Sequence, residues 1–129
     1  MNSSDNSEII KASAVSGTNG SRSIASAVLL SSKNVDAIQN CLGVAVIHPG
    51  EPATPEMVHK TSEVMYVSRG QGRLESGSES HEFSEGDALY IPAGKAHSLV
   101  NTGSIPLVSV YSFPLPYRPP TSVAEGNRA

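Results

Sequence analysis

The chain has 129 residues, enough for one domain with a buried core, and it carries a net charge of −3 with a pI of about 5.7. This acidic balance, without a basic stripe, argues against nucleic acid as a partner. No apolar run is long enough to span a membrane, and no basic head followed by an apolar block marks a secretory signal. The single cysteine, Cys41, excludes a disulfide framework, so a reducing, cytoplasmic location is expected.

The first segment, residues 1–23, is rich in Ser, Asn and Gly and poor in large apolar side chains. A segment of this composition cannot bury enough surface to fold alone, which predicts a flexible or partner-docked arm. From residue 24 onward, short β-type runs alternate with turn residues, as in antiparallel hairpins. The expected strands are residues 24–30, 44–47, 57–59, 63–67, 72–75, 81–83, 88–91, 97–100 and 107–113.

This spacing of short strands predicts an all-β sandwich or barrel over residues 24–113. Four prolines lie between residues 114 and 120, directly after the last expected strand. Proline cannot donate a hydrogen bond to a sheet, so these residues end the strand. Residues 114–129 are therefore predicted to form a proline-rich tail.

Two segments about two dozen residues apart carry the side chains that are able to bind a metal. The first holds His59 and Glu63 before a turn at Gly70, and the second holds His97 after a Pro-Ala-Gly turn. Alternate residues of a strand point to the same face, so these side chains are able to meet inside a barrel. Two imidazoles and a carboxylate are a known ligand set for a divalent metal with open positions. The sequence therefore predicts a metal site at His59, Glu63 and His97.

Together the two segments resemble the two sequence motifs of the cupin superfamily, small β-barrels of the jelly-roll type. The second motif, residues 86–101, matches the family pattern at every defined position, and the first matches in its second half. The resemblance covers residues 40–113 and implies a cupin-type jelly-roll β-barrel. It also implies that His59, Glu63 and His97 bind Fe(II), Mn(II), Ni(II) or Zn(II). A homodimer, formed through sheet faces or exchanged N-terminal strands, is a further implication of the resemblance.

The chain departs from the family pattern at one ligand position and in the spacing before it, where six residues instead of five separate Gly50 from Met57. The pattern usually includes another histidine two residues before His59, where this sequence has Met57. A thioether is a soft ligand that favours Cu(I), so Met57 is expected to line the pocket rather than to bind the metal. The remaining three ligands leave positions open for water, substrate or O₂.

Two classes of function are consistent with these residues. The first is a metal-dependent enzyme for a small polar metabolite, with Glu63 and Tyr111 as catalytic groups, because Tyr111 on the last strand is the phenol best placed for a pocket. Within this class the open ligand positions slightly favour a non-haem iron oxygenase over an isomerase, cyclase or lyase. The second class is a non-catalytic binding or regulatory module for a sugar or carboxylate, in which Met57 marks a degenerate metal site. Retention of the other three ligands favours the enzyme.

Overall fold

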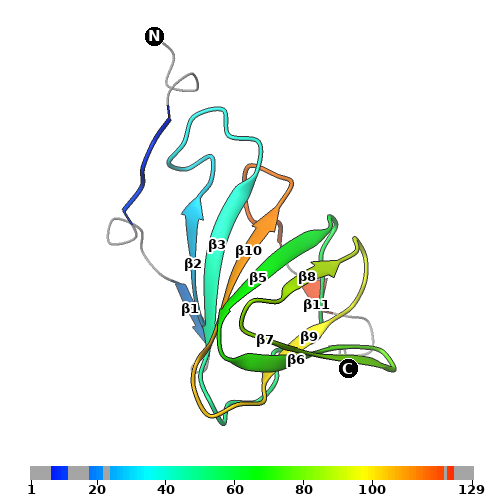
Figure 1. The fold of residues 1–129 in the computed structure, drawn as a ribbon. Helices are drawn as coiled ribbons and strands as arrows, with labels where there is room; N and C mark the ends of the chain where they lie inside the picture. The colour runs from blue at the N-terminus through cyan, green and yellow to red at the C-terminus, as the bar shows by residue number, and fades with distance from the viewer. Residues whose placement is uncertain (1–6, 12–17, 22–23, 121, 124–129) are drawn as a thin grey trace.

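The computed structural model describes residues 7–11, 18–21, 24–120 and 122–123, and these form an all-β jelly roll without a helix. A six-stranded antiparallel sheet has the order β1-β2-β3-β10-β5-β8, a three-stranded sheet has the order β7-β6-β9, and β11 pairs with β4. Figure 1 shows the smaller sheet crossing one end of the larger one, so that the two enclose an interior. The strands are β1 (Thr18–Ser21), β2 (Ile24–Leu30), β3 (Cys41–Ile47), β4 (Met57–Val58), β5 (Glu63–Arg69), β6 (Gln71–Ser76), β7 (Glu79–Ser84), β8 (Ala88–Ile91), β9 (Ser98–Asn101), β10 (Leu107–Phe113) and β11 (Ser122–Val123).

The alternation of buried and exposed residues along β5 shows how the sequence defines the interior. Glu63, Met65 and Val67 are buried, whereas Val64 and Tyr66 between them are half exposed. The period of two is that of a strand with one face toward the core. Glu63 thus lies on the same inner face as the apolar core, where a carboxylate requires a partner.

The nine strands expected from the sequence are all present. β2, β8 and β10 have the predicted bounds, and the other six differ by a few residues at one or both ends. Part of the predicted arm also forms a strand, because β1 pairs with β2 in an antiparallel arrangement. The rest of that arm, apart from residues 7–11, lies outside the described residues, so its flexibility stays a prediction.

Part of the predicted proline-rich tail pairs with the barrel. Ser122 and Val123 pair with Val58 and Met57, which makes β11 a neighbour of β4. Upstream of β11, the backbone N–H of Ser32 donates to the carbonyl of Pro116 over 2.7 Å. A two-residue strand carries no periodic pattern, so the sequence alone did not indicate this pairing.

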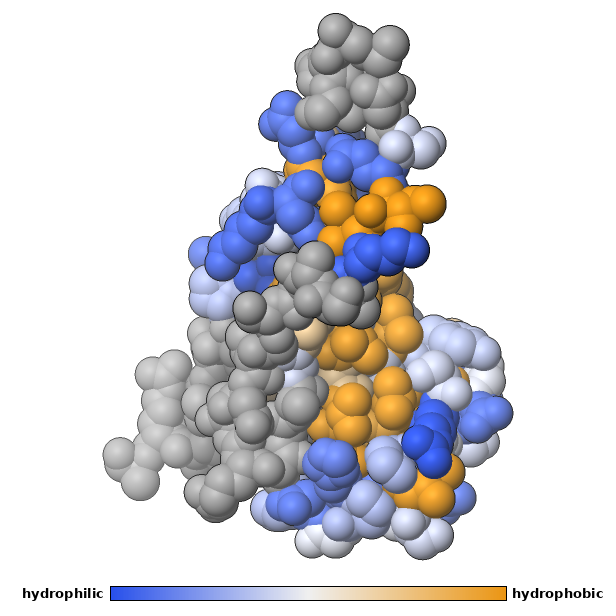
Figure 2. All heavy atoms as spheres, turned by 90° about the vertical axis from the view of Figure 1, so that its left-hand side faces the viewer, coloured by the Kyte–Doolittle hydropathy of each residue, from blue (hydrophilic) through white to orange (hydrophobic). Residues whose placement is uncertain are grey.

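The side of the molecule that carries β1 and β2 shows a band of apolar atoms flanked by polar ones (Figure 2). Residues 26–30 of β2 are only half-buried, and β2 pairs with β3 of its own chain. A contiguous apolar surface of this kind is typical of a face that meets another molecule. The expected homodimer stays a prediction. Within the described ranges, no helix has the length and apolar character needed to cross a membrane.

Candidate metal centre

Backbone contacts hold the two motifs together, although they lie far apart in the sequence. His59 follows β4, Glu63 begins β5 and His97 directly precedes β9. Met57 and His97 exchange two backbone hydrogen bonds, of 2.8 and 2.9 Å. The N–H of Gly94 donates to the carbonyl of His59 over 2.9 Å, and the φ of 77° at Gly94 is one that glycine adopts without strain. The second motif therefore fixes the backbone from Met57 to His59.

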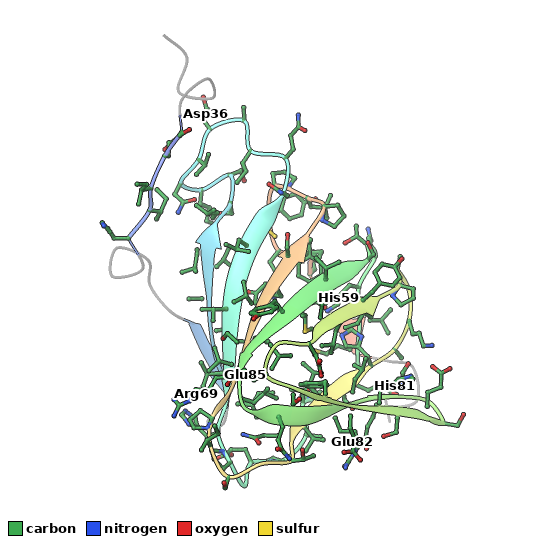
Figure 3. All side chains as sticks on the ribbon, viewed as in Figure 1. Asp36, His59, Arg69, His81, Glu82 and Glu85 are labelled. Carbon is green, nitrogen blue, oxygen red and sulfur yellow. The ribbon has the colours of Figure 1, made fainter. Side chains whose placement is uncertain are left out.

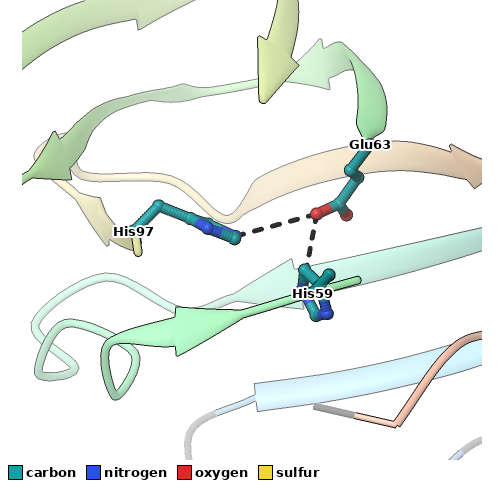
Figure 4. A group of neighbouring side chains, drawn as sticks. All are labelled: His59, Glu63 and His97. Carbon is teal, nitrogen blue, oxygen red and sulfur yellow. Dashed lines mark ion pairs between the residues drawn. The ribbon is translucent and has the colours of Figure 1, made fainter. Parts of the chain in front are cut away.

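The three predicted ligands meet inside the barrel (Figure 4). Their exposed fractions are 4% for His59, 5% for Glu63 and 1% for His97. Glu63 Oε1 lies 3.6 Å from His59 Nε2 and 3.7 Å from His97 Nε2, and one donor atom from each residue fits within 4.8 Å of the others. The structure thus brings together the residues that the two motifs indicated.

The hydrogen bonds of these residues favour metal binding. His97 Nδ1 lies 3.0 Å from the carbonyl of Lys95, so this nitrogen carries the hydrogen and Nε2 presents its lone pair to the centre. Glu63 Oε1 and His97 Nε2 are buried without a hydrogen-bond partner among the described residues. Such unsatisfied buried groups are costly, and a divalent ion would satisfy both of them. The side chains present therefore fit a metal ion.

Burial also shifts the pKa values of two of the predicted ligands. It raises the pKa of Glu63 to about 7, against the opposing effect of the Arg118 charge. It lowers the pKa of His59 to about 4, and the charges of His97 and Arg118 add to this shift. At neutral pH His59 is consequently a neutral imidazole, the form that binds metals. Glu63 is poised between its acid and its carboxylate, and a cation would stabilise the carboxylate.

We predict that metal binding near pH 6 displaces a proton from Glu63. Because the pKa of Glu63 is raised to about 7, the metal-free side chain is mostly protonated at pH 6, whereas a ligand must be ionised. The affinity contributed by Glu63 should therefore fall about tenfold for each pH unit below 7. Calorimetric titration with Zn²⁺ in buffers of different ionisation enthalpy counts the released protons. Wild type should release close to one proton more than Glu63→Gln, and equal release by the two proteins would contradict the prediction.

A cavity of about 120 Å³ adjoins the three ligands, and it is largely apolar. Met57 lines it, as the sequence predicted, together with Met65 and Leu99. Tyr111 also lines it, with its hydroxyl buried and without a hydrogen-bond partner among the described residues. Burial raises the pKa of Tyr111, so the phenol keeps its proton at neutral pH. Tyr111 therefore offers a hydrogen-bond donor to the cavity, beside the apolar side chains of Met57, Met65 and Leu99.

The remaining two histidines of the chain lie apart from this centre. His48 and His81 are exposed, and Figure 3 shows His81 at the edge of the smaller sheet, whereas His59 lies within the barrel. Neither exposed histidine joins a group of three possible ligands within the described ranges. Only the histidines of the two motifs thus contribute to the site.

Two residues that the sequence analysis did not single out shape the cavity. Arg118 reaches it from the segment after β10, and Gly43 of β3 leaves space for the ring of Tyr111 on the neighbouring strand. The one sequence signal for Arg118 is that it is the only charge in the proline-rich run 114–120. Gly43 interrupts an apolar strand, which is a weak sign of a close approach by another group.

Comparison with known proteins identifies the family to which this chain belongs. The cupin domain description matches residues 43–113, more than half of the chain. The chain belongs to the cupin domain family. This cupin is 30% identical to Protein SchB of Streptomyces halstedii over 92 residues, which cover 70% of this chain and 67% of that protein. It is 32% identical to glutelin type-B 1 of Oryza sativa subsp. japonica over 76 residues, but these cover only 15% of the glutelin.

Solved structures show the same fold at low sequence identity. The polyketide cyclase RemF from Streptomyces resistomycificus matches with a TM-score of 0.75 and 20% identity, over 92% of this chain and 86% of the cyclase. A mutant of Bacillus subtilis oxalate decarboxylase OxdC matches with a TM-score of 0.73 and 19% identity, over 84% of this chain and 29% of the decarboxylase. The decarboxylase contains Mn(II) centres. At these identities the likeness establishes the barrel and not the reaction.

Proposed function

We propose that this cupin is an enzyme that holds a divalent metal ion at His59, Glu63 and His97 and uses it as a Lewis acid on a small oxygen-bearing molecule. The observation that carries the proposal is the convergence of three buried donor side chains and the Tyr111 phenol on one cavity. A ligand set of two imidazoles and one carboxylate leaves positions open for a substrate. The metal stays one of Fe(II), Mn(II), Ni(II) or Zn(II), since these ions accept similar donors.

The side chains of the cavity have separable roles in this proposal. A bound divalent ion would supply polarisation of a carbonyl group, which makes the neighbouring carbon easier to deprotonate. Tyr111 keeps its proton at neutral pH and donates it, or a hydrogen bond, to a second oxygen of the substrate. Met57, Met65 and Leu99 exclude water and hold the apolar body of the substrate.

Within this class we favour a ring-closing or isomerising reaction. The proton donor at Tyr111 suits such chemistry, and one structural neighbour that matches over most of both chains is a polyketide cyclase. A non-haem iron oxygenase is the second candidate, because the open positions of the ligand set suit O₂. In both candidates Glu63 provides the negative charge that balances the metal.

A linear aromatic tri-β-ketone tests the proposal, because it can close a ring by aldol condensation with loss of one water. The full chain is loaded separately with each candidate metal, and product mass and O₂ uptake are followed together. We expect a product lighter by one water and no O₂ uptake. Tyr111→Phe should lower kcat by about 100-fold at unchanged metal content, as loss of a general acid commonly does.

The alternatives have distinct results in the same assay. A product heavier by oxygen atoms, formed with O₂ uptake by the iron-loaded protein alone, would replace the cyclase with an oxygenase. Binding without turnover for every metal would instead leave a binding module for a carboxylate or sugar. His59→Ala protein serves as the control for spontaneous ring closure.

A further inference from the structure

The segment that follows β10 reaches the cavity and brings Arg118 to its lining. Pro116 accepts the backbone hydrogen bond from Ser32, and Pro119 is buried. Further along, the pairing of β11 with β4 secures the segment beside the strand that precedes His59. Prolines restrict φ, so the direction of this segment is limited even before it packs. The position of Arg118 is therefore defined by contacts on both sides of it.

The guanidinium of Arg118 lies over the ring of Tyr111. Its Cζ is 5.6 Å from the ring centroid, which is a cation–π contact. Among the described residues, no carboxylate lies within ion-pair distance of Arg118. A guanidinium that stacks by its face keeps its N–H groups along the edge available. Those donors are suited to a planar carboxylate, which accepts two parallel hydrogen bonds.

The charge of Arg118 acts throughout the cavity. It opposes the rise that burial causes in the pKa of Glu63 and of Tyr111, and it adds to the lowering of the pKa of His59, as expected of a cation close to all three groups. A divalent ion balanced by one carboxylate would leave a net positive centre, to which Arg118 adds another charge. Such a cavity attracts an anion and repels a cation.

The size of the cavity limits the rest of the ligand. Its volume of about 120 Å³ is slightly smaller than the roughly 150 Å³ of an apolar cavity known to hold one benzene molecule. One ring or a short ketide unit therefore fills the closed part, beside Met57, Met65 and Leu99. A charged end group would extend toward the exposed side chain of Arg118.

We propose that Arg118 is the carboxylate receptor of this cavity and that the substrate is an acid with an apolar or aromatic body. The carboxylate pairs with the guanidinium above Tyr111, and the body extends toward His59, Glu63 and His97. This inference deepens the proposed function by naming its substrate class, and it rests on that function for the reaction but not for the anion site.

Benzoate and benzamide, an uncharged analogue of similar shape, test the inference. Binding of each to the full chain is measured by calorimetry, with and without Zn²⁺, for wild type, Arg118→Gln and Arg118→Lys. Arg118→Gln should weaken benzoate binding by about 10- to 100-fold, the effect of losing a hydrogen bond to a charged group, and benzamide binding by less than about twofold. Arg118→Lys should recover part of the benzoate affinity, because it restores the charge without the planar fork. Arg69→Gln, which changes an exposed arginine at the end of β5, should leave both affinities unchanged.

Three results would overturn the inference: equal benzoate affinity in wild type and Arg118→Gln, equal losses for benzoate and benzamide, or no benzoate binding by wild type. Metal content is measured on the same samples. If wild type binds no metal but Arg118→Gln still loses benzoate selectively, the anion site stands and the proposed function fails. If wild type binds metal but benzoate binds equally well to wild type and Arg118→Gln, the anion site fails and the proposed function stands.

Discussion

Replacing His59 and His97 together by alanine is expected to abolish metal binding. The change removes two of the three donors and leaves Glu63 alone at the site. The loss of affinity should exceed the roughly 10- to 100-fold that follows removal of a hydrogen bond supporting a ligand. Metal content is measured by elemental mass spectrometry on protein purified without chelators. The melting temperature, measured with and without added metal, should rise with metal in wild type but not in the His59→Ala, His97→Ala variant.

The matched control is the double variant His48→Ala, His81→Ala, which removes two exposed histidines of the same chain. It should retain the metal content of wild type. Circular dichroism of both double variants without metal separates loss of ligands from loss of fold. A folded His59→Ala, His97→Ala protein that still holds stoichiometric metal would refute the site, as would equal loss of metal in the control.

Gly43→Ala is expected to lower the free energy of unfolding by about 1–3 kcal/mol, the usual cost of overpacking a core. Gly43 and Tyr111 are partners across β3 and β10, and the phenol ring lies over the glycine. A Cβ at Gly43 would overlap this ring, with Tyr111 Cε1 only 2.7 Å away. The ring cannot move freely, because it is 4% exposed and packs edge-on against Phe113 at a centroid distance of 5.8 Å. Urea unfolding of the metal-free protein measures the loss.

A double-mutant cycle with Tyr111→Leu identifies the cause of this loss. In the Leu background the ring is absent, so Gly43→Ala should cost much less than in wild type. The coupling energy should account for most of the effect. An equal cost in both backgrounds would show that the backbone of β3, and not the contact with Tyr111, requires the glycine.

The sequence by itself indicated nine of the strands and the three side chains of the candidate metal site. Strand alternation indicated that Glu63 and Met65 share the inner face, and their burial agrees with it. Motif spacing indicated His59 and His97, and backbone hydrogen bonds between Met57 and His97 bring the two motifs together. These features were readable because they depend on local periodicity and on turn residues whose backbone preferences are intrinsic.

Only the tertiary structure revealed what surrounds the ligands. The pairing of β11 with β4, the position of Arg118 over Tyr111, and the space left by Gly43 join residues far apart in the chain. No periodic pattern encodes such contacts, because they arise from packing between strands rather than along one strand. The raised pKa of Glu63 likewise follows from desolvation inside the closed barrel, an environment that exists only after folding.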